Sequence, residues 1–316
     1  MSVYTLLERP ELEAFTAPYG LGRLLDFQGI AAGTENSNFF VSLEAGEYVL
    51  TLVERGQRAD LPFVVELLQR LHAAGLPVPY GVPTQSGECL RELAGKPALL
   101  QPRLAGQHVQ QPNAHHCAEV GSWLARMHLS SHGQILERRS DRGLDWMLSE
   151  GPLQALQLDG AALELLRSSL TEVAEAQTAI LALPRANLHA DLFRDNVLFD
   201  GPHLSGVIDF YNACSGPMLY DVAITLNDWC STATGELDLS RARALLGAYA
   251  GLRPFHPAEN ALWPCLLRIA CLRFWLSRLI AARQPAALGV QVKDPAEFEQ
   301  QLRQRQHVSL SLPMAL

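Results

Sequence analysis

Apolar and polar positions follow two different periods along this chain. In the N-terminal third, short apolar runs separated by polar turns predict strands. These are expected at Arg23–Ala31, Phe39–Glu44, Tyr48–Val53, around Val82–Gln85 and at Pro97–Pro102. Between the third and fourth runs, Leu67, Leu68 and Leu71 recur at helical spacing. They predict a helix over Leu61–Ala74 whose apolar face covers the strands.

Helical periodicity dominates the rest of the chain. Helices are expected at His115–Ser130, Gly160–Leu183, Leu219–Cys230, Leu239–Ala250, Ala258–Ala282 and Glu297–Gln306. A single hairpin, from Val197 to Ile208, interrupts them. Pro102 and Gly106 end the strand-rich part. The pattern therefore predicts an α+β fold of two lobes, a small antiparallel-sheet lobe at residues 1–103 and a larger helical lobe at 104–316.

Composition narrows the class of protein. A length of 316 residues exceeds the usual size of one core, and 48% hydrophobic with 18% charged residues is ordinary for a compact soluble protein. The net charge of −8 argues against binding nucleic acid. The six cysteines form no CxxC pair, and no apolar leader or uninterrupted membrane span is visible. We expect a cytoplasmic protein without nucleic-acid or membrane partners, and the oligomeric state is left open.

The candidate chemistry lies in the segment His189–Phe199 and in the strand that follows it. Asp191 precedes Asn196 by five residues, and Asp209 ends an apolar strand. This set corresponds to a kinase catalytic loop, in which one Asp orients a hydroxyl while an Asn and a second Asp hold metal ions. Asp and Asn also cluster in ordinary turns. The spacing of all three residues favours the functional interpretation.

Two neighbouring residues are expected to support this loop. His189 stands two residues before Asp191 and is interpreted as a brace. A metal-hydrolase site at His189 and Asp191 would need further histidines at ligand spacing, which the chain does not obviously provide. Asp221 begins a predicted helix and is interpreted as its cap and as a second brace of the loop.

Several segments resemble one superfamily. They are GTENSNF at 33–39, YVLTLVE at 48–54, DLPF at 60–63, NLHADLFRDNVL at 187–198, GVIDFY at 206–211 and YDVAITLNDW at 220–229. The chain resembles the aminoglycoside phosphotransferase and choline kinase superfamily, which has a bilobal protein-kinase-like fold, and within it the homoserine kinases. The resemblance extends from Val3 to about Arg305.

The resemblance implies an enzyme that uses ATP and Mg²⁺ to phosphorylate the side-chain hydroxyl of L-homoserine. It implies that Asp191 is catalytic and that Asn196 and Asp209 are metal ligands. The implied nucleotide contacts are Gly33, Asn36, Ser37 and Asn38 in a phosphate-facing loop, and Gln101, Arg103 and Leu104 in an adenine-facing linker. The residues alone also allow an ordinary hairpin turn at this loop, because it lacks a GxGxxG pattern.

One position departs from the superfamily. Most members carry a lysine on the third strand that contacts the phosphates and pairs with a helix glutamate, whereas Thr51 stands there in this chain. Glu66, the expected helix partner, therefore has no obvious lysine. Arg55, Arg194, or metal and backbone groups would have to supply the positive charge.

A zwitterionic acceptor needs a cation for its carboxylate and an acceptor for its ammonium group. The candidate cations are Arg268, Arg273 and Arg278, which cannot share one helix face because five residues rotate by about 140°. Asp228 is the candidate for the ammonium group, and Tyr211 a candidate wall of the pocket. Two alternatives stay open: a kinase of another amino alcohol such as choline or an aminoglycoside, and a nucleotide-binding regulator without catalysis.

Overall fold

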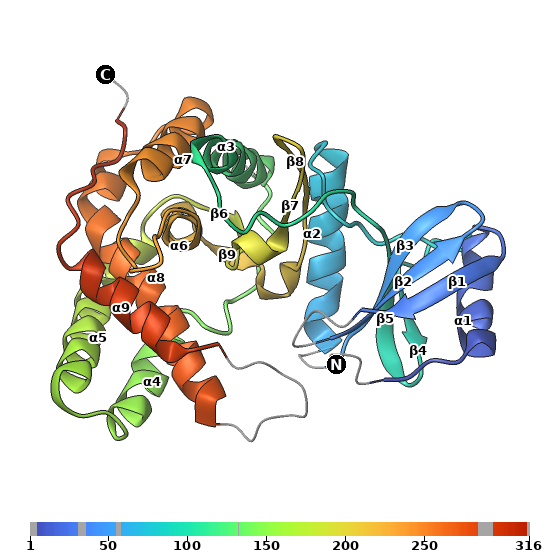
Figure 1. Ribbon diagram of the computed structural model, residues 1–316, viewed down its shortest axis with the longest axis horizontal. Coiled ribbons are helices and arrows are strands. Elements are labelled where there is room, and N and C mark those ends of the chain that lie inside the picture. The colour runs from blue at the N-terminus through green and yellow to red at the C-terminus, as the bar shows by residue number, and fades with distance from the viewer. Residues whose placement is uncertain (1–4, 31–35, 55–57, 132, 284–292, 315–316) are drawn as a thin grey trace. The chain divides into compact units, whose positions relative to one another are not determined.

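The computed structural model describes residues 5–30, 36–54, 58–131, 133–283 and 293–314 (Figure 1). These residues form two compact units. Unit 1 consists of the described residues up to Ala105, and unit 2 of those from Gly106 onward. Unit 1 is built on an antiparallel sheet and unit 2 is mainly helical, so the expectation of an α+β fold is confirmed.

A five-stranded antiparallel sheet in the order β1-β2-β3-β5-β4 forms the centre of unit 1. Its elements are α1 (Arg9–Thr16), β1 (Leu24–Gly29), β2 (Ser37–Leu43), β3 (Gly46–Leu52), α2 (Leu61–Ala73), β4 (Leu90–Leu93) and β5 (Lys96–Pro102). Alternate residues of β2 are buried and pack with Leu12 and Phe15 of α1. In α2 the predicted apolar face is confirmed, because Leu67, Leu68 and Leu71 are all buried.

The strand predicted around Val82–Gln85 is wrong. This segment has irregular structure, and the edge strand β4 lies further along the chain. Val82 does donate its backbone N–H to the oxygen of Leu100 at 2.8 Å. Pro83 has no N–H to continue a ladder, so the segment leaves the sheet after this contact.

Unit 2 is organised around α6, whose twelve residues are all buried. The helices are α3 (Ala114–Ser130), α4 (Leu144–Ala155), α5 (Gly160–Leu181), α6 (Met218–Trp229), α7 (Leu239–Leu252), α8 (Pro257–Arg283) and α9 (Pro295–Arg305). Figure 1 shows α6 end-on, with the other helices of this unit around it. Close packing of α3 on α7 requires glycine at position 121, because a Cβ there would collide with the backbone oxygen of Leu245.

Two short antiparallel ladders carry the candidate chemistry. They pair β6 (Arg185–Leu188) with β9 (Cys214–Pro217) and β7 (Val197–Asp200) with β8 (His203–Val207). The second ladder is the predicted hairpin, and Val197 pairs with Val207 at its open end. Asn196 and Asp209 therefore stand just outside the two ends of the same hairpin.

One helix of unit 2 was not predicted. α4 contains Gly151 and Pro152, which usually interrupt a helix. Gly151 faces Leu170 of α5 so closely that a Cβ would collide with that side chain. Packing between α4 and α5 thus overrides the weak local propensity.

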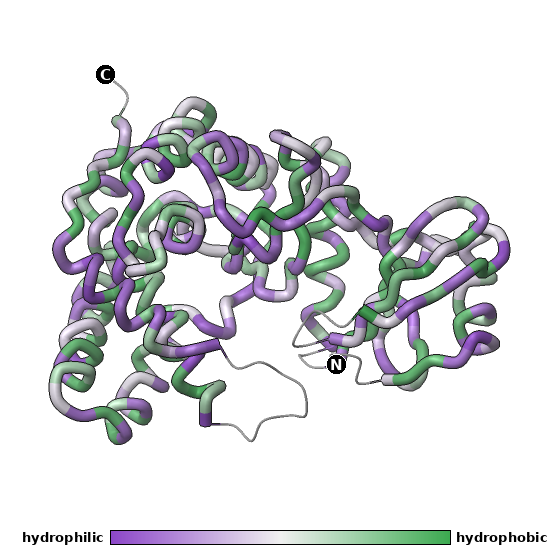
Figure 2. The backbone as a smooth tube through the Cα atoms, viewed as in Figure 1, coloured by the Kyte–Doolittle hydropathy of each residue, from purple (hydrophilic) through white to green (hydrophobic). Residues whose placement is uncertain are grey.

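Apolar residues are spread along the whole chain in short segments that alternate with polar ones (Figure 2). No helix within the described residues has the length and hydropathy needed to cross a membrane.

Candidate active site

A buried carboxylate fixes the backbone of the catalytic segment. Asp221, near the start of α6, accepts the backbone N–H groups of His189 and Ala190, each at 2.8 Å. It is fully buried and also lies 3.2 Å from His128 Nε2. Burial opposes ionisation of Asp221, but the hydrogen bonds from His128 and from the backbone of His189 outweigh it and lower its pKa. The expectation that Asp221 braces the loop is confirmed, whereas its expected role as the helix cap is wrong, because α6 begins at Met218 after Pro217.

This brace holds a strained backbone. Ala190 has φ = 60°, in the left-handed region that L-residues with a side chain rarely adopt. Asp209, at the start of the 3₁₀ turn Phe210–Asn212, has φ = 64°. Such conformations cost about 1–3 kcal/mol each and cluster at functional sites. Strain therefore coincides with the residue before the predicted catalytic Asp191 and with the predicted metal ligand Asp209 itself.

The His189 ring lies between the catalytic segment and β8. Nε2 is 3.0 Å from the backbone oxygen of Ile208, and Nδ1 accepts the backbone N–H of Asp191 at 3.3 Å. Complete burial lowers the pKa of His189 despite the nearby Asp221 and Asp191 charges. A neutral ring that donates from Nε2 satisfies both contacts. His189 is thus a brace, as expected.

Asp191 is half-buried at the end of this braced segment. Asn212 donates its side-chain N–H to Asp191 Oδ2 at 3.2 Å. Burial raises the pKa of Asp191, while the positive charge of Arg273 opposes the rise. One carboxylate oxygen is thereby oriented by an amide, and the charge of the group is balanced by a buried guanidinium.

Asn196 has an amide suited to metal binding. Its Nδ2 donates to the backbone oxygen of Asp191 at 2.9 Å, which directs Oδ1 away as an acceptor. Asp209 is exposed and follows the other strand at the same open end of the β7–β8 hairpin. Two oxygen ligands with additional phosphate and water oxygens are typical of Mg²⁺. Within the described parts of the chain, no group of three or more His, Cys, Asp or Glu side chains is placed to hold a metal.

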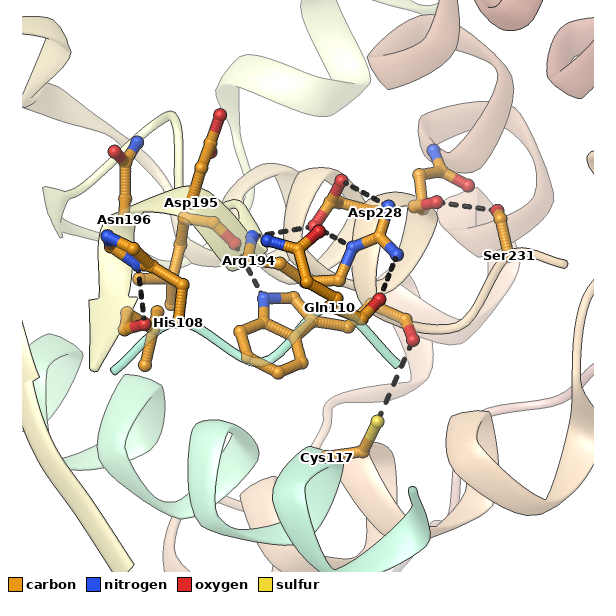
Figure 3. A network of polar contacts seen from close by, with 12 residues as sticks. His108, Gln110, Cys117, Arg194, Asp195, Asn196, Asp228 and Ser231 are labelled. Carbon is orange, nitrogen blue, oxygen red and sulfur yellow. Dashed lines mark hydrogen bonds and ion pairs between the residues drawn. The ribbon is translucent and has the colours of Figure 1, made fainter. Parts of the chain in front are cut away.

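Arg194 and Asp228 contact each other directly (Figure 3). The backbone N–H of Arg194 donates to Asp228 Oδ2 at 2.7 Å, and its Nε donates to the same oxygen at 3.1 Å. A terminal nitrogen of the Arg194 guanidinium, Nη1, donates to the backbone oxygen of Gln110 at 3.3 Å. Asp228 is 9% exposed, and burial raises its pKa against the opposing charge of Arg194. The two predicted ligands thus form an internal ion pair.

The three arginines of α8 have different environments, as their spacing predicted. Arg268 donates two hydrogen bonds from Nε to the Glu172 carboxylate, and Arg278 pairs with Glu297 at 2.6 Å. Arg273 is only 2% exposed and donates from one terminal nitrogen to the backbone oxygen of Ala190. Its Nε has no hydrogen-bond partner within the described residues. Arg273 is therefore a buried cation placed against the catalytic segment.

Two further tyrosines lie near this region. Tyr211 is half-buried, and its backbone oxygen accepts from Arg138 at 3.0 Å. Tyr220 precedes Asp221, is 8% exposed, and its hydroxyl has no hydrogen-bond partner in the described structure. Burial raises the pKa of Tyr220, and the positive charge of Arg273 opposes the rise. A buried hydroxyl and a buried guanidinium thus adjoin each other.

The predicted phosphate-facing residues that the structure describes lie where β2 begins and β3 ends. Asn36 accepts the backbone N–H of Glu54 at 3.2 Å, and Ser37 donates to the Glu54 carboxylate. Asn38 accepts from Thr51 at 2.7 Å. Gly33 and Arg55 lie outside the described residues.

The predicted adenine-facing linker lies at the end of β5. Gln101 is 8% exposed and donates to the backbone oxygen of Pro79. Arg103 is exposed, and its guanidinium carbon lies 3.9 Å from the centre of the Phe40 ring. Leu104 is half-buried. Glu66, expected to lack a lysine partner, pairs instead with Arg70 one helical turn away at 2.8 Å.

Comparisons with known proteins agree on one family. A model of the phosphotransferase enzyme family (APH) matches residues 26–255. The chain belongs to this family. It is 66% identical to the homoserine kinase of Pseudomonas aeruginosa over 316 residues, which are 100% of each chain. It is 43% identical to the homoserine kinase of Methylobacillus flagellatus, covering 96% of this chain and 95% of that protein.

Solved structures of this phosphotransferase group share the fold. The amicoumacin kinase hAmiN in complex with AMP-PNP, Ca²⁺ and Ami has a TM-score of 0.69 at 16% identity. The match covers 95% of this chain and 92% of that one. The expected protein-kinase-like fold is confirmed.

Two residues at this candidate site were missed by sequence reasoning. Asn212 contacts Asp191, and Tyr220 adjoins Arg273. Asn212 lies three residues after the strand-ending Asp209, so its nearness in sequence was the available signal. Tyr220 lies inside the segment at 220–229, and no sequence signal separates a buried tyrosine hydroxyl from an exposed one.

Proposed function

We propose that the chain transfers the γ-phosphoryl group of ATP to the side-chain hydroxyl of L-homoserine, giving O-phospho-L-homoserine. Homoserine is proposed as the substrate because the chain is 66% identical, over its full length, to a protein named homoserine kinase. The observation that carries the chemistry is the position of Asp191. Its backbone N–H is bonded to His189, which Asp221 holds in place, and its carboxylate is half-buried beside a buried cation.

In this proposal Asp191 accepts a hydrogen bond from the acceptor hydroxyl and takes its proton. The hydroxyl oxygen attacks the γ-phosphorus, and the bond to the leaving ADP oxygen breaks. Because the transition state is loose, orientation of the hydroxyl matters more than basicity of the carboxylate. The hydrogen bond from Asn212 to Asp191 Oδ2 supplies part of this orientation by fixing one oxygen of the carboxylate.

Asn196 and Asp209 are the proposed magnesium ligands. Magnesium, when bound, neutralises the charge on the phosphate oxygens. The chain's own contribution is to fix one ligand before β7 and the other after β8, both at the open end of the hairpin. The backbone oxygen of Asn196 also accepts the N–H of Ile208 at 2.9 Å, which ties the two ends together.

Arg273 is the proposed clamp for the homoserine carboxylate. Its guanidinium is buried, it forms no ion pair with any described carboxylate, and its Nε is unpartnered among the described residues. Arg268 is disfavoured for this role because Glu172 occupies its guanidinium. A buried cation favours an acceptor that carries a carboxylate over polycationic aminoglycosides or choline. Tyr211 stays a proposed wall of the acceptor site.

The predicted roles of Asp228 and Arg194 in binding substrate have less support from the contacts in the structure. Asp228 was predicted for the ammonium group and Arg194 for phosphate charge, but each is bonded to the other. We propose that this pair positions the catalytic segment from the side opposite Asp221. Binding of phosphate or ammonium by either group would require the ion pair to open.

Unit 1 is the proposed nucleotide-binding lobe, and unit 2 the catalytic and acceptor-binding lobe, with the boundary at residues 103 and 104. The proposed nucleotide residues are Gly33, Asn36, Ser37, Asn38, Gln101, Arg103 and Leu104. A cytoplasmic location stays a prediction.

A panel of acceptors tests the proposed function. Release of ADP would be followed with MgATP and L-homoserine, choline or an aminoglycoside as acceptor. We expect turnover with homoserine that exceeds turnover with the others by at least about 100-fold, as sites built to pair a charged group discriminate. Turnover with choline or an aminoglycoside but not with homoserine would favour a kinase of another amino alcohol. MgATP binding without transfer to any alcohol would favour a regulator.

A further inference from the structure

A buried carboxylate and a lysine meet at one end of the sheet in unit 1. Glu54 follows β3, and Lys96 is the first residue of β5. The backbone N–H of Val53 donates to the oxygen of Pro97 at 2.9 Å, which continues the β3–β5 ladder to this point. Lys96 Nζ forms an ion pair with Glu54 Oε2. The Glu54 side chain is 7% exposed and that of Lys96 34% exposed.

The other carboxylate oxygen of Glu54, Oε1, accepts hydrogen bonds from two hydroxyl groups. Thr5 Oγ1 donates to Oε1 at 2.7 Å, and the Ser37 hydroxyl donates to the same oxygen. Lys96 also donates to Thr5 Oγ1 at 2.6 Å. Burial opposes ionisation of Glu54, but the hydrogen bonds from Lys96, Ser37 and Thr5 outweigh it and lower its pKa. Glu54 is thus a charged junction between four segments of unit 1.

This junction reaches the proposed phosphate contacts directly. Ser37 begins β2, and its hydroxyl is held by the carboxylate of Glu54. Asn36 is held by the backbone N–H of the same residue at 3.2 Å. Both are buried, and each has a polar contact with Glu54, Asn36 with its backbone and Ser37 with its carboxylate.

The position where most members of the superfamily carry a lysine has no cation in this chain. Thr51 occupies the usual lysine position and is bonded to Asn38, and Glu66 is bonded to Arg70. The chain has only one other lysine, Lys293, which belongs to unit 2 and pairs with Asp195. The lysine–glutamate pair in unit 1 therefore joins the ends of two strands instead of joining a strand to α2.

We propose that Lys96 is a positioning residue for the nucleotide, acting through its ion pair with Glu54 on Asn36 and Ser37. This rests on the proposed function, since it assumes that unit 1 binds the phosphates. A lysine that loses Glu54 cannot fulfil this role, and a Glu54 without Lys96 is a buried carboxylate short of one donor. The two side chains should therefore act as one unit.

The test is direct binding of MgADP by calorimetry to the full chain, with KM values for MgATP and homoserine measured in parallel. Lys96→Met and Glu54→Gln should each weaken MgADP binding by about tenfold, within the usual range of coupling between sites. The double variant should bind no more weakly than the weaker single variant. The double variant removes both charges and so leaves no unpaired buried carboxylate. Its MgADP affinity can therefore still be compared with wild type if Lys96→Met alone is unstable. Lys96→Arg should recover most of the affinity.

A matched control removes an exposed ion pair from the same unit. Arg23 lies 2.7 Å from Glu44 and is 84% exposed, so Arg23→Met should leave MgADP binding unchanged. The KM for homoserine should stay within about twofold in all variants, because the acceptor site is in unit 2.

Three results would overturn the inference. The first is an unchanged MgADP affinity with a lower melting temperature, which would leave only a structural role. The second is weaker binding in Lys96→Met but not in Glu54→Gln, which would make Lys96 a direct phosphate ligand. The third is additive losses in the double variant. A wild-type chain that binds no MgADP would contradict the proposed function itself.

Discussion

Arg273 donates a hydrogen bond to the backbone oxygen of Ala190, the residue immediately before the proposed catalytic carboxylate. The donor comes from α8 and the acceptor from a strained position with φ = 60°. A guanidinium that is 2% exposed and forms no ion pair with a described carboxylate is costly to bury. Binding of a substrate carboxylate would offset this cost and explain why the cation lies there.

Replacing Arg273 should therefore affect the acceptor and not the nucleotide. Arg273→Met should lower kcat/KM for homoserine by about 100-fold, as expected when a buried charge pair loses one member. The KM for MgATP should change little. The matched control is Arg268→Met, which lies on the same helix as Arg273 and pairs with Glu172 of α5. Steady-state kinetics with each substrate varied separately would check this, and equal losses in both variants would contradict the assignment.

The pair of Arg194 and Asp228 leads to a second prediction. If the pair positions the catalytic segment, Arg194→Met and Asp228→Asn should each lower kcat by about 10- to 100-fold, because small misplacements of reacting groups have effects of this size. Both variants should leave the KM for MgATP nearly unchanged. A raised KM for MgATP in Arg194→Met alone would show instead that Arg194 contacts phosphate.

The buried His189 ring predicts a pH dependence of stability. Burial lowers its pKa in the folded chain, while the unfolded value is about 6.5. The stability from the neutral ring is thus complete above about pH 6.5 and is lost as the pH falls toward the folded pKa. Between pH 7.5 and 5.5 the wild-type free energy of unfolding should fall by about 1 kcal/mol more than that of His189→Gln.

Urea unfolding at the two pH values would measure this difference. The glutamine variant keeps a donor and an acceptor but does not titrate, so every other group contributes equally to both proteins. Parallel pH dependence in the two proteins would mean that the pKa of His189 is the same in the folded and unfolded chains, which would contradict the prediction.

The sequence predicted the parts of the site that are close together along the chain. Asp191, Asn196 and Asp209 lie on one loop and one hairpin, so local spacing is enough to relate them. The contact of Arg273 with Ala190 spans 83 positions and depends on how α8 packs against α6. Three arginines at equal spacing look alike in sequence, and only packing separates the buried one from the two that pair with glutamates.

The errors in the fold have local physical causes. α4 was missed because Gly151 and Pro152 are poor helix residues, and its stability comes from contact with α5. The edge strand was placed too early because Val82 has strand character, whereas Pro83 cannot donate to a ladder. Likewise, the closeness of Lys96 to Glu54 follows only from the β3–β5 register, which the sequence does not show.

The central claim is that Asp191 accepts the proton of the homoserine hydroxyl. The most direct test is single-turnover transfer from MgATP to L-homoserine by Asp191→Asn, with MgADP affinity measured on the same sample and Asp195→Asn as a neighbouring control. Asp191→Asn should slow transfer by about 1000-fold or more, in the range of general-base contributions, while MgADP binding and the control stay near wild type. Transfer by Asp191→Asn at a rate close to wild type would contradict the account.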